Sequence, residues 1–312
     1  MFNSLQLNQG DGHFSEIGLL AGVAKTDWSW SVLGADFDLD GWEDLIVTNG
    51  FRRDSKDNDF LAKFRKAKTE AGGRQAMMDR GLMMEWVEKI PSQRIRNYLF
   101  QNSGELSFSD KSIEWGFHDG SFSNGAVYSD LDADGDLDLV ISNIDDPAFI
   151  YENRVQQLHP ENRFLRVQPV DEQGVIVANT RVHVVAGGRE QMKELTTCRG
   201  FQSGVEPVLH FGLGEVELIE SVIVHWPSGK QTNITDVKPS QLLVVKPDQG
   251  SSVADAVATE KFFSPTAKQI SLWHAENKHD EYEKEILLPH SQSNWAGVGC
   301  WRCEWRLSLI HI

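Results

Sequence analysis

The chain has 312 residues, of which 40% are hydrophobic, and a formal net charge of -16 at pH 7. This length allows two or three domains, and the apolar content supports folded cores rather than disorder. The acidity argues against a general nucleic-acid-binding protein, because phosphate contacts need a basic surface. Three cysteines are too few for a disulfide framework, and no apolar run reaches the length of a transmembrane helix.

The first fifty residues predict short strands separated by Gly/Asp turns, and one of these turns is strongly acidic. In "GADFDLDGWEDLIVTNG", residues 34–50, carboxylates recur at every second position before an apolar run. Like charges this close repel each other unless a divalent cation gathers their oxygens around one point. With Asp36 at position 1, Gly41 at position 6 permits the bend and Trp42 offers a backbone carbonyl at position 7. The expected ligands of this first loop are Asp36, Asp38, Asp40, Trp42 and Asp44.

Residues 51–96 have a different pattern, with apolar side chains at helical spacing. Gly72-Gly73 interrupts this pattern and predicts two helices rather than one. The apolar stripe is typical of a helical excursion packed on the blades, and the alternative is a lid or a partner-binding insertion. The residues of the stripe are Phe60, Leu61, Phe64, Met77, Met78, Leu82, Met83, Trp86 and Val87.

The acidic pattern returns in "YSDLDADGDLDLVISNI", where Asp130 lies 94 residues after Asp36. The same offset aligns "LQLNQGDGHF" with "LFQNSGELSF", so that residues 3–50 and 97–144 form an internal repeat. Self-similarity of this length indicates propeller blades or a solenoid. The expected ligands of the second loop are Asp130, Asp132, Asp134, Asp136 and Asp138.

Both loops are expected to bind Ca²⁺, which gives about two sites. An EF-hand would need Glu at position 12 and flanking helices, but Val47 and Ile141 occupy that position within strand-like runs. The aspartate at position 9 therefore closes each loop. The role of the loops is expected to be structural, because all four acids of each loop would be ligands and none would be left as a general base. The alternatives are a solvated acidic turn without metal, and Mg²⁺, which tolerates a crowded all-protein shell less well.

Residues 162–247 predict a small β domain, because strand-like runs alternate with turn residues. His210, His225 and Arg199 invite comparison with a catalytic site, but their spacing assembles no nucleophile, base and acid. We interpret them as polar residues that fix turns at strand edges. The motifs of this segment are Gly187-Gly188, Arg199-Gly200-Phe201, His210-Phe211-Gly212-Leu213-Gly214 and Trp226-Pro227-Ser228-Gly229.

The end of the chain is interpreted as a linker and the run-in to a further propeller, residues 248–294, followed by an unrelated tail. A one-base frameshift after Asn294 can spell "GPGLAVGDVNG", and the final "LSLIHI" is the translation of a transposon-type sequencing adapter. We therefore predict that residues 295–312 are an artefact, and that Cys300 and Cys303 form no redox or metal site. The sequence is then expected to be a metagenomic fragment, and its opening residues show no signal peptide.

The acidic loops and their strands resemble the FG-GAP/VCBS repeat, the calcium-binding blade of integrin-type β-propellers. The motifs of residues 162–247 resemble the ASPIC/UnbV domain. The resemblance implies a mainly β chain, with incomplete FG-GAP-type propeller blades, a helical insertion and a small β-sandwich-like domain. It also implies secreted, calcium-associated proteins related to cartilage acidic protein, of bacterial type and without a known catalytic activity. The expected domains are a first blade at 1–50, a helical insertion at 51–96, a second blade at 97–153 and the ASPIC/UnbV domain at 162–247.

The expected function is a calcium-binding, non-catalytic β-propeller module for adhesion to a protein or glycan, outside the cell or on its outer surface. The remaining blades of the full-length chain are further expected partners, whereas nucleic acid is not. Trp28, Trp30 and Trp115 are candidates for stacking on sugar rings, with packing in the blade cores as the alternative.

Two other functions stay open at this point, a structural subunit of a surface complex and a polysaccharide-degrading enzyme. The enzyme would need paired carboxylates, or a His/Tyr/Arg cluster, outside the two loops. The acidic residues available for this are Asp27, Glu43, Glu114 and Asp119.

Overall fold

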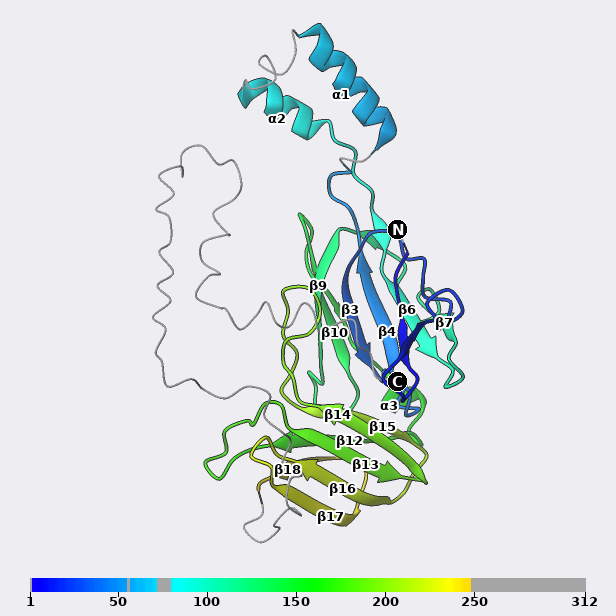
Figure 1. Ribbon diagram of the computed structural model, residues 1–312, viewed down its shortest axis with the longest axis vertical. Coiled ribbons are helices and arrows are strands. Elements are labelled where there is room, and N and C mark those ends of the chain that lie inside the picture. Colours follow the sequence, from blue (N-terminus) through cyan, green and yellow to red (C-terminus); the bar gives the residue numbers. More distant parts are fainter. Residues whose placement is uncertain (1, 55–56, 72–79, 248–312) are drawn as a thin grey trace.

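The computed structural model describes residues 2–54, 57–71 and 80–247. The linker and tail at 248–312, with Cys300 and Cys303, lie outside the described residues, as do Gly72, Gly73, Met77 and Met78. The chain is mainly β, as expected. Two stacked sheets form its middle, a pair of helices projects from one end, and a β sandwich lies at the other end (Figure 1).

The first stacked sheet is antiparallel and has the strand order β3-β4-β6-β7. Its strands are β3 (Ser29–Ala35), β4 (Asp44–Asn49), β6 (Tyr98–Asn102) and β7 (Phe108–Asp110). A hairpin of β1 (Gln6–Asn8) and β2 (Phe14–Glu16) precedes it in the chain. Since β6 and β7 come from the second repeat unit, this sheet combines strands of both units.

The second stacked sheet has the order β11-β10-β9, and its strands β9 and β10 repeat β3 and β4 of the first sheet residue for residue. Its strands are β9 (Ser123–Ser129), β10 (Asp138–Asn143) and β11 (Phe149–Tyr151). The 94-residue offset carries the bounds of β2, β3 and β4 onto those of β7, β9 and β10. A short ladder pairs β5 (Ile95–Arg96), which precedes the second unit, with β8 (Gly120–Ser121) inside that unit. The internal repeat is therefore also a repeat of structure.

Strand β4 is buried along its whole length because both of its faces are covered. Ile46 packs with Leu139 and Ile141 of the second sheet, while Leu45 and Val47 pack with residues around the β1–β2 hairpin. This explains why the sequence of β4 is an apolar run rather than an alternating one. Among the described residues the two sheets stack like neighbouring blades, but they do not close into a ring.

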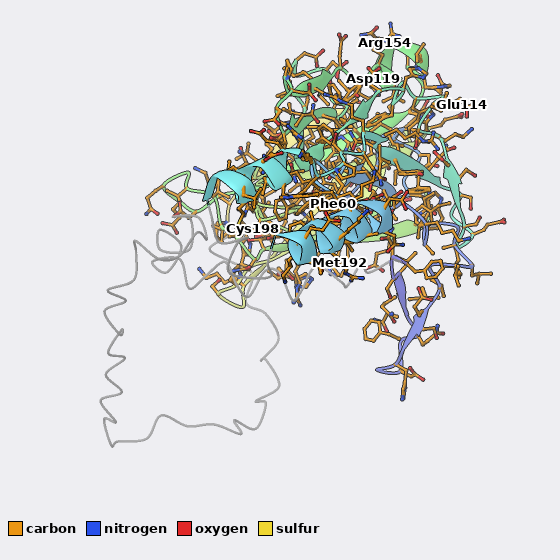
Figure 2. All side chains as sticks on the ribbon, turned by 90° about the horizontal axis from the view of Figure 1, so that it is seen from above. Phe60, Glu114, Asp119, Arg154, Met192 and Cys198 are labelled. Carbon is orange, nitrogen blue, oxygen red and sulfur yellow. The ribbon has the colours of Figure 1, made fainter. Side chains whose placement is uncertain are left out.

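The helical insertion forms two helices, α1 (Asn58–Glu70) and α2 (Arg80–Glu88). Asp57 caps α1, since its carboxylate accepts the N–H of Phe60 at 2.6 Å. Trp86 of α2 lies 6.0 Å from Phe60 and 5.4 Å from Phe64, measured between ring centroids. Figure 2 shows Phe60 on the side of α1 that faces α2. These aromatic side chains therefore pack between the helices rather than on the stacked sheets, because two amphipathic helices this close in sequence can cover each other.

The β sandwich consists of the sheets β15-β12-β18 and β14-β13-β16-β17. A short helix, α3 (Val155–Leu158), connects it to the stacked sheets. Alternate residues such as Val182, Val184 and Val222 face a common core with Leu165 and Phe211 of the other sheet. The strands are β12 (Arg163–Pro169), β13 (Arg181–Ala186), β14 (Arg189–Glu194), β15 (Leu209–Gly214), β16 (Ile219–His225), β17 (Gln231–Val237) and β18 (Gln241–Val245). No helix in the described part of the chain has the length and apolar content needed to cross a membrane.

Candidate metal centre

The two acidic loops join equivalent strands and have the same backbone conformation. The first loop, residues 36–44, connects β3 to β4, and the second, residues 130–138, connects β9 to β10. Position 4 is left-handed in both, with φ of 61° at Leu39 and 64° at Ala133. Position 6 is left-handed as well, with φ of 91° and 103°, and glycine occupies it because it adopts this conformation without steric cost. The sequence pattern thus produces the same tight turn twice.

The turn brings the carboxylates of positions 1, 3 and 9 together in each loop. One oxygen each from Asp36, Asp38 and Asp44 lies within 4.8 Å of the others, and the equivalent oxygens in the second loop meet the same limit. Two oxygens that bind one Ca²⁺ at about 2.3–2.6 Å lie at most about 5 Å apart. The spacing of the two groups, the second made by Asp130, Asp132 and Asp138, therefore fits a calcium ion.

Positions 5 and 7 have a different role in the loop geometry. Asp40 accepts the N–H of Trp42 at 2.7 Å, and Asp134 accepts the N–H of Asp136 at 3.1 Å. These side chains fold back on the turn and are not part of the two groups of three oxygens. Of the ten predicted ligand residues, six thus converge in the described structure, and the position 5 and position 7 residues lie in the same turns beside them.

Backbone N–H groups hold most of the converging carboxylates in place. Asp36 accepts the N–H of Gly41 at 2.7 Å, and Asp44 accepts those of Phe37 at 3.1 Å and Asn102 at 2.9 Å. Asp138 repeats the arrangement of Asp44 in the second loop. Such donors favour the charged form of each carboxylate and fix its direction.

Asn102 and Asn153 hold two of the candidate ligands, and the sequence analysis did not assign them. Each donates its backbone N–H to the position 9 aspartate of its blade, at 2.9 Å and 2.8 Å respectively. Each also accepts the N–H two residues further on, in the manner of an Asx turn. The signal was present, since "FQN" ends β6 and "YEN" starts on the last residue of β11, but the long insertion separates β4 from β6 and hides the match.

The second loop contains a polar atom without a partner. Asp130 Oδ1 is buried and makes no hydrogen bond within the described residues, although Arg166 binds Oδ2 at 2.5 Å. The side chain of Asp130 is 0% exposed. A buried carboxylate oxygen without a donor is costly, and a bound cation would satisfy it.

Burial and mutual repulsion disfavour the charged forms of these acids when no cation is present. Burial, followed by the charge of Asp38, raises the pKa of Asp44 to about 8 and that of Asp40 to about 6. The pKa of Asp36 is raised well above its ordinary value, first by burial and then by Asp44. In the second loop, burial raises the pKa of Asp136 to about 7. The loops therefore concentrate negative charge where water stabilises it poorly.

The structure does not gather the other sequence candidates into a catalytic site. Glu43 pairs with Lys193 and Glu114 with Lys111, each at 2.7 Å, and Figure 2 shows Glu114 and Asp119 apart on the surface. Asp27 lies in a left-handed turn before β3. The remaining candidates occupy separate elements: His210 is buried in β15, His225 ends β16, and Arg199 follows β14.

The three tryptophan candidates are half-buried. Trp115 packs against the core between the two sheets. Trp30 donates to the Gly50 carbonyl at 2.8 Å, and its ring centroid lies 5.2 Å from that of Phe201. Trp28 stacks on Phe51 at 4.4 Å. Packing therefore accounts for much of their surface.

Most of the β sandwich matches a known domain family. Residues 174–252 match the family model of the ASPIC and UnbV domain, so the chain contains an ASPIC/UnbV domain. The matched region begins inside the sandwich, whose first strand, β12, opens at Arg163.

Curated relatives match a longer part of the chain than the family model does. Cartilage acidic protein 1 of Xenopus tropicalis is 34% identical over 116 residues, which are 36% of this chain and 17% of that protein. The human protein of the same name is 32% identical over 113 residues, 35% of this chain and 16% of that protein. The chain thus matches less than a fifth of the length of these relatives.

Proposed function

We propose that the chain is a calcium-binding, non-catalytic module of the FG-GAP/VCBS type that acts outside the cell or on its surface. One Ca²⁺ would bind in each acidic loop, held by the carboxylates of positions 1, 3 and 9 with further oxygens from the turn. The rigid blades would then present their loops to a protein or glycan ligand.

The observation that carries this proposal is the duplication of the loop geometry. Two segments 94 residues apart place three carboxylate oxygens within 4.8 Å, on turns with the same left-handed positions. Acids in an ordinary solvated turn have no reason to converge, because water screens separated charges at lower cost. The raised pKa of Asp44, which burial causes first, and the unpartnered Oδ1 of Asp130 both support a cation as the missing partner.

Two further observations support the remaining parts of the proposal. The relatives' name refers to cartilage, which favours a location outside the cell. Millimolar calcium occurs there, and structural calcium modules of that environment bind with Kd of about 10⁻⁴–10⁻³ M. The ion pairs of Glu43 and Glu114 support a non-catalytic role, because they leave these carboxylates engaged with lysines.

Calorimetric titration of the chain with CaCl₂, combined with thermal melts in calcium and in chelator, tests the proposal. We expect about two sites and a higher melting temperature in calcium. Asp36→Ala and Asp130→Ala should each remove one site and leave the other. A folded chain that takes up no calcium would overturn the proposal.

A further inference from the structure

The ASPIC/UnbV domain lies directly on the first loop through its strand β15. The N–H of Gly214 donates to the Leu39 carbonyl at 2.7 Å, which joins the edge of the sandwich to position 4 of the loop. Two residues earlier, a Cβ on Gly212 would overlap the carboxylate of Asp36. The backbone of β15 therefore touches a proposed calcium ligand, and only glycine leaves room for this approach.

Strand β14 adds two basic side chains to the same loop. The Arg189 guanidinium donates to the carbonyls of Asp40 at 3.2 Å and Gly41 at 3.0 Å, and lies 4.1 Å from the ring centroid of Trp42. Lys193 pairs with Glu43 at 2.7 Å. Positions 5 to 8 of the first loop are thus all bound by this domain.

The second loop is held by the same face of the domain. His210 of β15 donates to the Gly135 carbonyl at 2.8 Å, the position that Arg189 binds in the first loop. The ring of Phe164 occupies the space beside Gly135, so that a Cβ there would overlap it. Arg166 of β12 binds Asp130 at 2.5 Å and Glu206 at 2.7 Å. One surface of the sandwich therefore covers both acidic loops.

A third contact of the sandwich lies away from the loops, on strand β3 of the first stacked sheet. The N–H of Phe201 donates to Ser31 of β3 at 3.1 Å, and the Phe201 ring packs against Trp30. A Cβ on Gly200 would overlap the hydroxyl of Ser31. The motifs at 199–201 and 210–214, which carry the likeness to the ASPIC/UnbV domain, are therefore contact residues of this interface.

Docking of this kind covers a carboxylate and should depend on what compensates its charge. Asp36, which the backbone of Gly212 approaches, is 1% exposed in the docked arrangement. Burying an uncompensated charge is costly, whereas burying the same carboxylate beside a divalent cation is much less so. An ion that favours the docked state must in turn be bound more tightly by it, because coupling between two equilibria is reciprocal.

We propose that the face of the ASPIC/UnbV domain formed by β15, Arg166, Arg189 and the 199–203 segment is a docking surface for the pair of acidic loops, and that calcium in the loops strengthens this docking. The inference rests on the proposed calcium binding. It assigns to the domain a partner within the same chain, a pair of calcium-loaded blades.

Hydrogen exchange measured by mass spectrometry on the whole chain tests the coupling directly. The Gly214 amide is a reporter, since its bond partner is the Leu39 carbonyl of the first loop. We expect slower exchange of peptides containing Gly214 in calcium than in chelator, while peptides from β16 and β17 change little. If calorimetry shows calcium binding but the Gly214 peptides exchange equally in both conditions, the docking inference fails and calcium binding stands. If no calcium binds, both fail.

Gly212→Ala tests the reciprocal effect at the first loop, because it changes the docking contact without replacing a ligand residue; Phe201→Ala separates docking from direct displacement of the Asp36 carboxylate. The added methyl group would meet Asp36 across the interface, and the backbone of β15 itself does not need glycine there. We expect calcium affinity of the first loop to fall by about fivefold or more. Unchanged affinity in the folded variant would overturn the coupling.

Phe201→Ala serves as a second variant should Gly212→Ala fold poorly. It is neutral and removes a docking contact far from both loops, and its matched control is Phe64→Ala in the helical pair, which loses an equivalent half-buried ring outside the interface. We expect Phe201→Ala to weaken calcium binding at both loops and Phe64→Ala to leave it unchanged. Equal affinities in the two variants would contradict the inference.

Discussion

The two acidic loops have the same sequence pattern and backbone, but the molecule compensates their charge differently. In the first loop a neutral amide, Gln101, donates to Asp38 at 2.6 Å, and among the described residues no cationic side chain forms an ion pair with the three converging carboxylates. In the second loop the Arg166 guanidinium binds Asp130 directly. The first loop should therefore depend more strongly on calcium, because Arg189 and Lys193 bind its backbone carbonyls and Glu43 rather than the converging carboxylates, whereas Arg166 binds Asp130 itself.

The largest expected effect comes from neutralising position 3 in each loop. Asp38→Asn and Asp132→Asn should each weaken calcium binding at their own loop by at least about tenfold, since a charged ligand is lost. In chelator the two variants should differ. Asp38 is the strongest charged neighbour behind the raised pKa of Asp44 and Asp40, so Asp38→Asn should raise the melting temperature by about 2–4 °C.

Asp132→Asn is the matched control for that experiment. Asp132 is exposed, so its charge is already well solvated, and its removal should leave the melting temperature in chelator nearly unchanged. Calorimetry and thermal melts of both variants, each in calcium and in chelator, give the full comparison. Equal shifts in chelator would show that the two loops are equally strained without calcium.

Arg166→Met tests the guanidinium that distinguishes the second loop. In chelator it should destabilise the chain by about 3 kcal/mol, because Asp130 and Glu206 lose their partner in a mostly buried site. In calcium the loss should be smaller, since the ion itself compensates Asp130. Arg181→Met is the control, because Arg181 pairs with Glu194 on the exposed side of the same domain. An identical loss in both conditions would mean that Arg166 and the ion do not serve the same carboxylate.

The local features of the molecule were predictable from its sequence, and the relation between its parts was not. The acidic positions, the glycine at position 6 and the strands on either side follow from short-range pattern, and the structure forms both turns where the pattern indicates. The insertion at 51–96 separates β4 from β6 in the sequence, and the periodicity of the two strands does not indicate that they pair. Gln101 and Asn102 lie beside the first loop through that pairing, and Asn153 lies beside the second loop because it follows β11, which pairs with β10.

The contacts between the sandwich and the loops were equally hidden. Gly212 belongs to a motif that sequence analysis connects with the domain itself, yet its constraint comes from Asp36, far away in the chain. His210 was interpreted as a turn-fixing residue at a strand edge, whereas the structure buries it against the Gly135 carbonyl. For long-range contacts of this kind, the sequence contains the required residue but does not indicate which distant contact requires it.

His210 and Arg189 provide a comparison at position 6, where the two loop carbonyls are bound by different donors. Burial, above all, lowers the pKa of His210 to about 3, and the charges of Lys193 and Arg166 act in the same direction while Glu43 opposes them. The unfolded chain takes up this proton near pH 6.5 and the folded chain does not, so stability is lost as the pH falls from about 6.5 toward 3.

His210→Gln keeps a donor for the Gly135 carbonyl and removes this titration. In chelator, the wild type should lose on the order of 2 kcal/mol relative to the variant between pH 7.5 and pH 5, measured by denaturant unfolding. The use of chelator separates the effect from calcium release. If the difference in stability between wild type and variant stays constant over this range, burial does not lower the pKa of His210 in the folded chain.

Arg189→Lys gives the smallest expected effect and completes the comparison. Lysine keeps the positive charge, but it cannot donate to two carbonyls in the planar fork that now spans Asp40 and Gly41, and it stacks less well on Trp42. The loss should be about 0.5–1 kcal/mol, the range of an exposed cation–π contact with one neutral hydrogen bond. Because arginine and lysine both stay charged between pH 5 and pH 7.5, the loss should be the same at both values, unlike that of His210→Gln. Arg181→Lys, on the opposite side of the domain, should change stability by less than this. A pH-dependent loss of stability in Arg189→Lys would contradict the assignment of the pH dependence to His210 alone.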